Sequence, residues 1–408
     1  MENLQNKTEY CLNCKNKPCQ LGCPLGNDIP EFIRLAKEHK YKEAYEALSK
    51  TTVMPFICGK ICPKSKQCQG KCIRGIKGQP VSIGEIENAI GEMAIQNKWY
   101  EDVEKPATNG KKIAIIGAGP AGITASIWLA KNGWKVKVFE KHKKIGGILR
   151  YGIPEFRLEK RYIDVLEQYM QKLGIIIETN KMLGKDFEIK ELLEKYSTVF
   201  LSEGANVSNK MGIPGEELGQ VMGANELLEY ENHPDYSGKK IIVIGGGNVA
   251  MDAARTIKRM GAKEVTVVYR RAIEQMPAEP KEVEEARNEG INFLFQVNVK
   301  SIESKKAYCI RTQLVQKDGE ARLVPVEIPE SKFAIDADYV VMAIGAKLNN
   351  TGVENIELTE KGYIKIDEMY KTSIPHVYAA GDNTGGVSTV AWASFYGREA
   401  AKNIDKNE

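Results

Sequence analysis

Cysteine carries the most distinctive chemistry in this sequence, because eight of its nine cysteines fall into two short groups. The first group, "CLNCKNKPCQLGC", spans Cys11–Cys23, and the second, "CGKICPKSKQCQGKC", spans Cys58–Cys72. Such thiols can form disulfides, bind zinc, act as a redox C-x2-C pair or hold iron–sulfur clusters. Zinc ribbons pair one C-x2-C with another, and only the first group has that spacing. Pro24 and Pro63 each follow a cysteine, which suits iron–sulfur ligation. On these residues alone the alternatives stay open.

A glycine motif that can cradle phosphate groups follows the apolar stretch "IAII". Gly117, Gly119 and Gly122 form G-x-G-x-x-G at the start of a predicted helix. The glycines permit a tight turn, close approach of backbone N–H groups to a pyrophosphate, and close helix–strand packing. Glu140 closes the next strand 23 residues after Gly117, where a carboxylate accepts hydrogen bonds from ribose hydroxyls. Strand, spacing and acid together predict a dinucleotide site.

A second copy of this pattern has a different ending. Gly245, Gly247 and Ala250 form G-x-G-x-x-A, but Arg270 and Arg271 stand where the acid would close the second strand. A ribose 2′-phosphate needs a cation there, and arginine offers a bidentate fork. This copy therefore predicts an NADP(H) site.

Two dinucleotide sites in one chain suggest hydride transfer from a nicotinamide to a flavin. The Gly381–Asp382 pair follows a buried strand and can hold a ribityl or pyrophosphate group, with the next helix facing the isoalloxazine. The stretch "GGILRYGIPEFRLEK" after the first copy supports the same interpretation.

The elements that must position these residues are a helical N-terminal segment and a duplicated α/β region. The two copies start at Lys111 and Lys239, and the linker-like stretch "EDVEKPATNGKK" precedes the first. Within residues 27–50 we expect two short helices, with Asn27 or Asp28 as the first N-cap. Ser82 and Glu85 predict a capping-box start for a helix running towards Trp99.

Length and composition narrow the class of protein. At 408 residues the chain exceeds what one core usually supports, so two or three domains are expected. A net charge of +4 without a dense Lys/Arg tract gives no indication of nucleic-acid binding. No apolar run reaches the roughly 18 residues of a membrane helix, and the N-terminus lacks an apolar signal region. We therefore expect a cytoplasmic protein, in which structural disulfides are disfavoured.

Taken together, the motifs carry a family resemblance over nearly the whole chain. They occur in family order: C-x2-C-x4-C-x3-C-P at 11–24, the second cysteine group, "GAGPAG", "GGILRYGIPEFRL", "GGGNVAMDAARTIKRMGA", "VVYRR" with "MPA", and the late "GD". The chain resembles the small subunit of NADPH-dependent glutamate synthase and the N-terminal half of dihydropyrimidine dehydrogenase. Both are flavin and iron–sulfur electron-input modules. One departure is the loop "GANVSNKMGIPGEEL", whose first part is less typical.

The resemblance implies an α/β fold with an N-terminal helical iron–sulfur domain and two Rossmann-like dinucleotide-binding domains. The cluster domain would cover residues 1–108. A split FAD domain would cover 109–235 and 334–408. The NADP(H) domain, 236–333, would be inserted into it.

By matching position, the family also implies which residues touch the cofactors. The FAD site would comprise Gly117, Gly119, Pro120, Ala121, Gly122, Glu140, Gly147, Ile148, Arg157, Leu183, Gly381, Asp382, Thr389 and Val390. The NADP(H) site would comprise Gly245, Gly246, Gly247, Asn248, Val249, Arg270, Arg271, Ala343 and Gly345. No side chain is expected to act as a catalytic acid or base, because the chemistry takes place on FAD and the nicotinamide.

For the cysteines, the resemblance implies two 4Fe–4S clusters with interleaved ligands. One cluster would be held by Cys11, Cys14, Cys19 and Cys72. The other would be held by Cys23, Cys62 and Cys68, with Glu87 as a carboxylate ligand or near-ligand. Cys58 would be a neighbour, and Cys309 a buried small residue. A flavin that receives two electrons needs one-electron carriers, which zinc cannot provide, so clusters are favoured over zinc.

The implied activity is transfer of electrons from NADPH through FAD and the clusters to a partner, either a larger catalytic subunit or a ferredoxin-like acceptor. The favoured interpretation is a glutamate synthase small subunit. The alternatives are the electron-input subunit of a dihydropyrimidine dehydrogenase and a ferredoxin:NADP oxidoreductase. A redox-silent scaffold would leave two nucleotide sites without a purpose.

Overall fold

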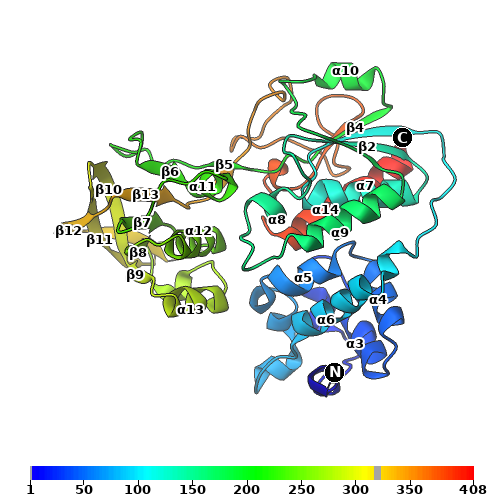
Figure 1. Cartoon of the computed structure of the whole chain (residues 1–408), viewed down its shortest axis with the longest axis horizontal. Helices are drawn as coiled ribbons and strands as arrows, with labels where there is room; N and C mark the ends of the chain where they lie inside the picture. The colour runs from blue at the N-terminus through cyan, green and yellow to red at the C-terminus, as the bar shows by residue number, and fades with distance from the viewer. Residues whose placement is uncertain (1, 317–322) are drawn as a thin grey trace. The chain divides into compact units, whose positions relative to one another are not determined.

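The computed structural model of the chain describes residues 2–316 and 323–408, which form two compact units (Figure 1). The first unit comprises residues 1–150, 155–205 and 348–408, and the second comprises 151–154 and 206–347. Among the described helices, none combines the length and the apolar character that crossing a membrane requires.

The first unit begins with short helices, because its apolar residues recur with helical spacing between capping and turn residues. Helix α3 starts after Asp28, whose carboxylate accepts a hydrogen bond from the Glu31 N–H at 3.3 Å. Helix α6 does follow Ser82, but within the described chain that side chain makes no capping hydrogen bond, so the capping-box prediction is wrong. The helices are α1 (Glu2–Glu9), α2 (Pro18–Leu21), α3 (Ile29–Lys37), α4 (Tyr41–Ser49), α5 (Pro55–Ile61) and α6 (Ile83–Gln96), with single 3₁₀ turns η1 (Lys64–Lys66), η2 (Gln69–Lys71), η3 (Ile73–Ile76) and η4 (Trp99–Glu101).

A parallel sheet with the order β15-β4-β1-β2-β3 forms the rest of the first unit. Its strands are β1 (Lys112–Ile116), β2 (Lys135–Glu140), β3 (Ile176–Thr179), β4 (Thr198–Leu201) and β15 (Val377–Ala379). Helices α7 (Pro120–Lys131), α9 (Arg161–Lys172) and α14 (Val390–Asn407) lie together on the side towards the N-terminal helices (Figure 1). The short helix α10 (Ile189–Leu193) and apolar residues of 348–366 pack against the opposite face.

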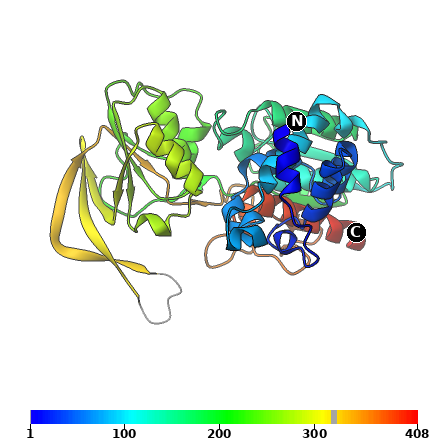
Figure 2. The same ribbon diagram turned by 90° about the horizontal axis from the view of Figure 1, so that it is seen from below.

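The second unit repeats this plan and adds an antiparallel layer. Its parallel sheet has the order β6-β13-β7-β8-β9, and α12 and α13 cover one face. The antiparallel strands, yellow to orange in Figure 2, pack on the other face through residues such as Val299 and Cys309. The elements are β5 (Val207–Ser208), β6 (Val221–Gly223), α11 (Ala224–Glu229), β7 (Lys240–Ile244), α12 (Asn248–Arg259), β8 (Glu264–Tyr269), η5 (Ile273–Gln275), α13 (Pro280–Asn288), β9 (Asn292–Phe295), β10 (Val297–Glu303), β11 (Lys306–Val315), β12 (Val324–Asp336), β13 (Tyr339–Met342) and β14 (Ala346–Lys347).

The second unit is wider than the insertion predicted at 236–333. Strand β6 pairs with β13, which pairs with β7, and β14 pairs with β5, so the boundaries fall near 206 and 347 instead. Residues 206–235 therefore belong to the second unit and not to the predicted first FAD segment. Residues 1–108 group with the first unit rather than forming a unit of their own.

Candidate functional site

The first glycine loop lies at the carboxyl end of β1, where helix α7 begins. Gly117 has φ +91°, and a Cβ there would lie 2.6 Å from the Ser202 carbonyl oxygen, so only glycine fits. Gly119 is the N-cap of α7, which starts at Pro120 and buries Ala121 and Gly122. The loop thus presents a helix N-terminus at the edge of a parallel sheet, the arrangement that binds a pyrophosphate.

Glu140 lies beside this loop at the end of β2 and is only 3% exposed. Its two carboxylate oxygens accept hydrogen bonds from the Ala118 N–H at 2.8 Å and the His142 N–H at 2.9 Å. These bonds fix the carboxylate against the glycine loop. A carboxylate held beside the glycine loop at the end of the second strand is the group that accepts hydrogen bonds from ribose hydroxyls in dinucleotide sites.

A second glycine turn packs against the first. The Gly146 N–H donates to the Ala118 carbonyl at 2.8 Å, and a Cβ on Gly147 would lie 2.8 Å from the Gly119 Cα. Gly147 therefore forms part of the same cradle, and the partly exposed Ile148 follows it at the start of α8 (Ile148–Tyr151).

The other predicted FAD residues lie in different surroundings. Arg157 is half-buried in the loop before α9. The Leu183 side chain is 3% exposed and belongs to the core, so only its backbone can face a cofactor. Thr389 caps α14 through a 3.3 Å hydrogen bond accepted from the Trp392 N–H, and Val390 opens that helix.

Asp382 provides an independent test of whether a flavin fits this edge. It follows Gly381, which has φ +103°, at the carboxyl end of β15. Burial raises the pKa of Asp382 to about 6, and its Oδ1 is a buried acceptor that has no partner within the described residues. Buried acceptors normally have donors. The hydroxyl groups of a ribityl or ribose chain would supply them, so the residues fit FAD.

Sequence reasoning missed one residue at the same edge, Glu203. It follows β4, its Cα would lie 3.0 Å from a Cβ on Gly117, and burial raises its pKa to about 7. A carboxyl group two residues after the apolar strand "TVFL", at the same sheet edge as Gly117 and Gly381, was the available signal.

The second glycine loop joins β7 to α12 in the second unit. Gly245 has φ +145°, and a Cβ there would lie 3.2 Å from the Ala343 Cβ at the end of β13. The predicted residues Gly246, Gly247, Asn248 and Val249 continue the loop into α12, and Gly345, with φ +101°, lies two residues beyond Ala343.

The "MPA" segment folds over this loop. The Ala278 N–H donates to the Gly246 carbonyl at 3.0 Å, and the Asn248 Oδ1 accepts from the Glu279 N–H at 2.9 Å. These hydrogen bonds from the "MPA" segment fix the glycine loop, in addition to the strand and the helix that the loop connects.

The arginine pair directly follows β8, and its two members differ in exposure. The Arg270 side chain is exposed, and its carbonyl accepts a 2.8 Å hydrogen bond from the Thr312 hydroxyl. Arg271 is half-buried, and its Nε donates to the Leu323 carbonyl at 3.3 Å. The backbone that follows β8 is thus anchored to the antiparallel layer. The Arg270 guanidinium lies in solvent, at the position where the sequence pattern predicts the 2′-phosphate of NADP.

The structure places the four cysteines of the first expected set around one cavity. The thiols of Cys11, Cys14, Cys19 and Cys72 line one cavity, although Cys72 is more than fifty residues from the others. Burial, together with smaller contributions from the nearby Cys11 and Cys72 thiols, raises the pKa of Cys19 to about 11. Such thiols release their protons on binding a metal centre.

The second predicted set also comes together. Cys23, Cys62 and Glu87 all act electrostatically on Cys68, and burial raises the pKa of its thiol. Burial likewise raises the pKa of Glu87 to about 8. Cys58, expected to be a neighbour and not a ligand, is buried against Cys62. In residues 2–316 and 323–408, no three His, Cys, Asp or Glu side chains are grouped as a single metal ion would require. The assignment to clusters therefore rests on these groupings and on family membership.

A hydrogen-bonded chain holds Glu87 in place. The Asn27 Nδ2 donates to the Glu87 Oε1 at 3.2 Å, and the Thr51 hydroxyl donates to the Asn27 Oδ1 at 2.6 Å. Arg398 on α14, 6% exposed, donates to the carbonyls of Thr51 at 2.7 Å and Leu25 at 2.8 Å. The last helix of the chain thus anchors both loops beside the second cysteine set.

Replacing Asn27 with alanine should leave the Glu87 Oε1 without its donor, which costs about 1–3 kcal/mol for a buried carboxylate. We expect the electron paramagnetic resonance signal of one reduced cluster to change in shape or intensity, with FAD content unchanged. Asn97→Ala, the same change at the exposed end of α6, is the control. Identical spectra for the two variants would show that Asn27 has no influence on a cluster.

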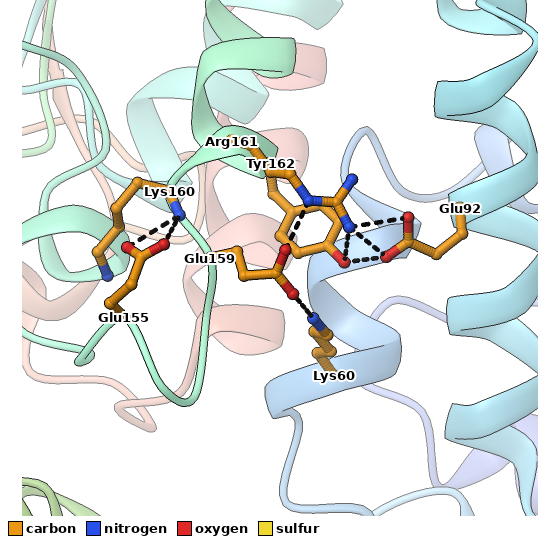
Figure 3. A network of polar contacts seen from close by, with 7 residues as sticks. All are labelled: Lys60, Glu92, Glu155, Glu159, Lys160, Arg161 and Tyr162. Atoms are coloured by element: carbon orange, nitrogen blue, oxygen red, sulfur yellow. Dashed lines mark hydrogen bonds and ion pairs between the residues drawn. The ribbon is translucent and has the colours of Figure 1, made fainter.

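A second polar network joins the N-terminal helices to α9 (Figure 3). Glu159 accepts hydrogen bonds from the Lys60 Nζ at 2.7 Å and the Arg161 Nε at 2.6 Å. Arg161 and the Tyr162 hydroxyl both donate to Glu92 on α6. This network and the Arg398 hydrogen bonds both join residues 1–108 to the rest of the first unit.

Comparison with known families agrees with this architecture. Residues 111–397 match the model described as pyridine nucleotide-disulphide oxidoreductase, and residues 1–99 match the one described as dihydropyrimidine dehydrogenase domain II, 4Fe–4S cluster. The chain is therefore an oxidoreductase of the FAD- and NADP-binding class with an N-terminal 4Fe–4S domain.

Individual relatives narrow the class. The chain is 35% identical to the glutamate synthase [NADPH] small chain of Escherichia coli, over 98% of this chain and 90% of that protein. It belongs to the glutamate synthase small-chain family. It is also 33% identical to the NADP(+)-dependent formate dehydrogenase subunit beta of Moorella thermoacetica, over 95% of this chain and 59% of that protein. FprA of Mycobacterium tuberculosis in complex with NADPH shares the fold, with a TM-score of 0.65, 20% identity and coverage of 73% of this chain and 84% of that one.

Proposed function

We propose that this chain is an electron-input unit that takes electrons from NADPH and delivers them to a larger catalytic subunit. Bound FAD and NADPH would supply hydride chemistry, and two 4Fe–4S clusters would supply one-electron transfer. The observation that carries the proposal is the meeting of Cys11, Cys14 and Cys19 with the distant Cys72 in one cavity. The comparison with glutamate synthase small chains supports a catalytic partner of the glutamate synthase type.

The protein's part in this function is binding and positioning. The Gly117 loop and Glu140 would hold the FAD pyrophosphate and ribose, and Asp382 would accept from a hydroxyl of the same cofactor. The Gly245 loop and Arg270 would hold NADPH. We place the protein in the cytoplasm within this proposal, because reducing conditions keep cluster ligands available.

The cofactor content tests the proposal directly. Protein purified without oxygen should carry about eight iron and eight sulfide per chain, together with one FAD, and NADPH should bleach the flavin absorbance. Cys309→Ser, which removes the lone cysteine of the antiparallel layer, should leave all three contents unchanged. Stoichiometric zinc without sulfide would rule out electron transfer through clusters.

A further inference from the structure

The surface around the two cysteine groups has an unusual charge pattern. We define the cysteine face as residues 10–27 and 58–81, which contain no Asp or Glu. The whole chain carries 58 Lys and Arg against 54 Asp and Glu, so such an acid-free region is not explained by composition. Its basic residues are Lys15, Lys17, Lys60, Lys64, Lys66, Lys71, Arg74 and Lys77.

The two segments of the cysteine face form one continuous surface. The Arg74 Nε donates to the Tyr10 carbonyl at 3.0 Å, and the Tyr10 hydroxyl donates to the Gln79 carbonyl at 3.1 Å. Both segments also line the cavity that holds the first cysteine set. The cations of both segments therefore lie on one surface, where Lys17 is paired with Asp28 at 2.6 Å and Lys60 with Glu159 at 2.7 Å, and the exposed Lys15, Lys71 and Lys77 provide further positive charge.

The cysteine face also exposes large apolar side chains. Leu21 is 85% exposed and Ile76 is 76% exposed, the highest values among the exposed large hydrophobic residues of the described chain. Leu12 and Ile73 are exposed as well and line the mouth of the cavity. Exposed apolar groups of this kind mark interaction surfaces.

The cations alone have a simpler explanation, because they could offset the negative charge of thiolate-bound clusters. That explanation does not account for Leu21 and Ile76, which would gain nothing from a cluster behind them. An apolar centre with a charged rim is instead the usual anatomy of a protein interface. The exposed Lys15, Lys71 and Lys77 give this surface a positively charged rim.

We propose that the cysteine face docks the electron-accepting protein, and that the accepting surface has an apolar centre with an Asp/Glu rim. This inference rests on the proposed function, since electrons leaving through the first cysteine set would emerge here. Opposite charge on the partner steers the encounter, and the apolar contacts hold the complex.

An acidic bacterial two-cluster ferredoxin is the probe, and its affinity and its rate of reduction by NADPH are measured separately. The triple variant Lys15→Glu/Lys71→Glu/Lys77→Glu should weaken ferredoxin binding about tenfold or more and remove most of its salt dependence. The control Lys185→Glu/Lys190→Glu/Lys361→Glu reverses exposed lysines elsewhere in the first unit and should bind like the wild type. Leu21→Ser/Ile76→Ser should also weaken binding, but without changing the salt dependence.

Iron, sulfide and FAD contents and flavin bleaching by NADPH are measured on every variant. Normal contents and bleaching with unchanged ferredoxin affinity in the triple variant would overturn the docking proposal alone. A wild type that NADPH does not bleach would overturn the proposed function itself. Tighter binding of the wild type to phosphatidylserine vesicles or duplex DNA than to ferredoxin would also overturn the docking proposal, because the charge pattern would then serve a different partner.

Discussion

The Cys11→Ala/Cys14→Ala variant should lose electron delivery to an acceptor protein while NADPH still reduces its flavin. Both thiols line the first cavity, and the described residues that line it do not include any from the Gly117 or Gly245 loop. We expect about half of the iron to be lost, normal bleaching of the flavin in stopped-flow absorbance, and reduction of the acceptor at the background rate only.

The competing explanation is that the metal ligands merely hold the N-terminal helices together, since removing such ligands can unfold a small metal-held domain. Circular dichroism and FAD content distinguish the two, because unfolding would release flavin along with iron. Cys58→Ala removes a buried thiol beside the second set and serves as the matched control. A double variant that keeps FAD and reduces its acceptor at the wild-type rate would contradict the proposed path.

Replacing Arg270 and Arg271 with glutamine should lower kcat/KM for NADPH and leave that for NADH nearly unchanged. Loss of one charge-assisted hydrogen bond to a phosphate costs about 1.5–3 kcal/mol, or about 10- to 150-fold in kcat/KM. Of the two single variants, Arg270→Gln should lower kcat/KM for NADPH more than Arg271→Gln, because the Arg271 Nε already donates to the Leu323 carbonyl.

Steady-state kinetics with ferricyanide as acceptor give both values without involving the partner. Lys263→Gln, at another exposed cation of the second unit, is the control. An unchanged ratio of the NADPH and NADH values in the double variant would mean that the 2′-phosphate binds elsewhere.

The glycine loops were predictable from sequence because their requirements are local. Gly117 and Gly245 each adopt a positive φ directly after an apolar strand, and a residue with a Cβ would collide with the neighbouring strand end. A motif that depends on such backbone constraints is visible in a few consecutive residues.

The boundaries of the second unit were not predictable in this way. Strands β6 and β14 have three and two residues, and their pairing with β13 and β5 places them in the unit. Short strands carry little pattern of their own, and parallel neighbours are joined through distant crossovers. Residues 206–235 therefore looked like part of the preceding domain.

The set of cluster ligands was still harder to predict from sequence, because it depends on which distant segments the fold brings together. Spacing shows that Cys11, Cys14 and Cys19 are close, but not that Cys72 completes their cavity, and the resemblance supplied that residue. Glu203 looked like an ordinary surface acid, and only the fold reveals its burial beside Gly117.

The hydrogen bonds from Arg398 to Leu25 and Thr51 also bear on how the protein is made. A ribosome adds about 5–20 residues per second, and Arg398 is synthesised 347 residues after Thr51. The loop that carries Cys23 and the loop at Thr51 thus leave the ribosome roughly 20–70 s before the helix that anchors them exists. During that interval the thiols are open to oxidation, and the pocket that would receive the second cluster is incomplete. Maturation of that pocket therefore waits until α14 has been made, long after the loop that carries Cys23 has left the ribosome.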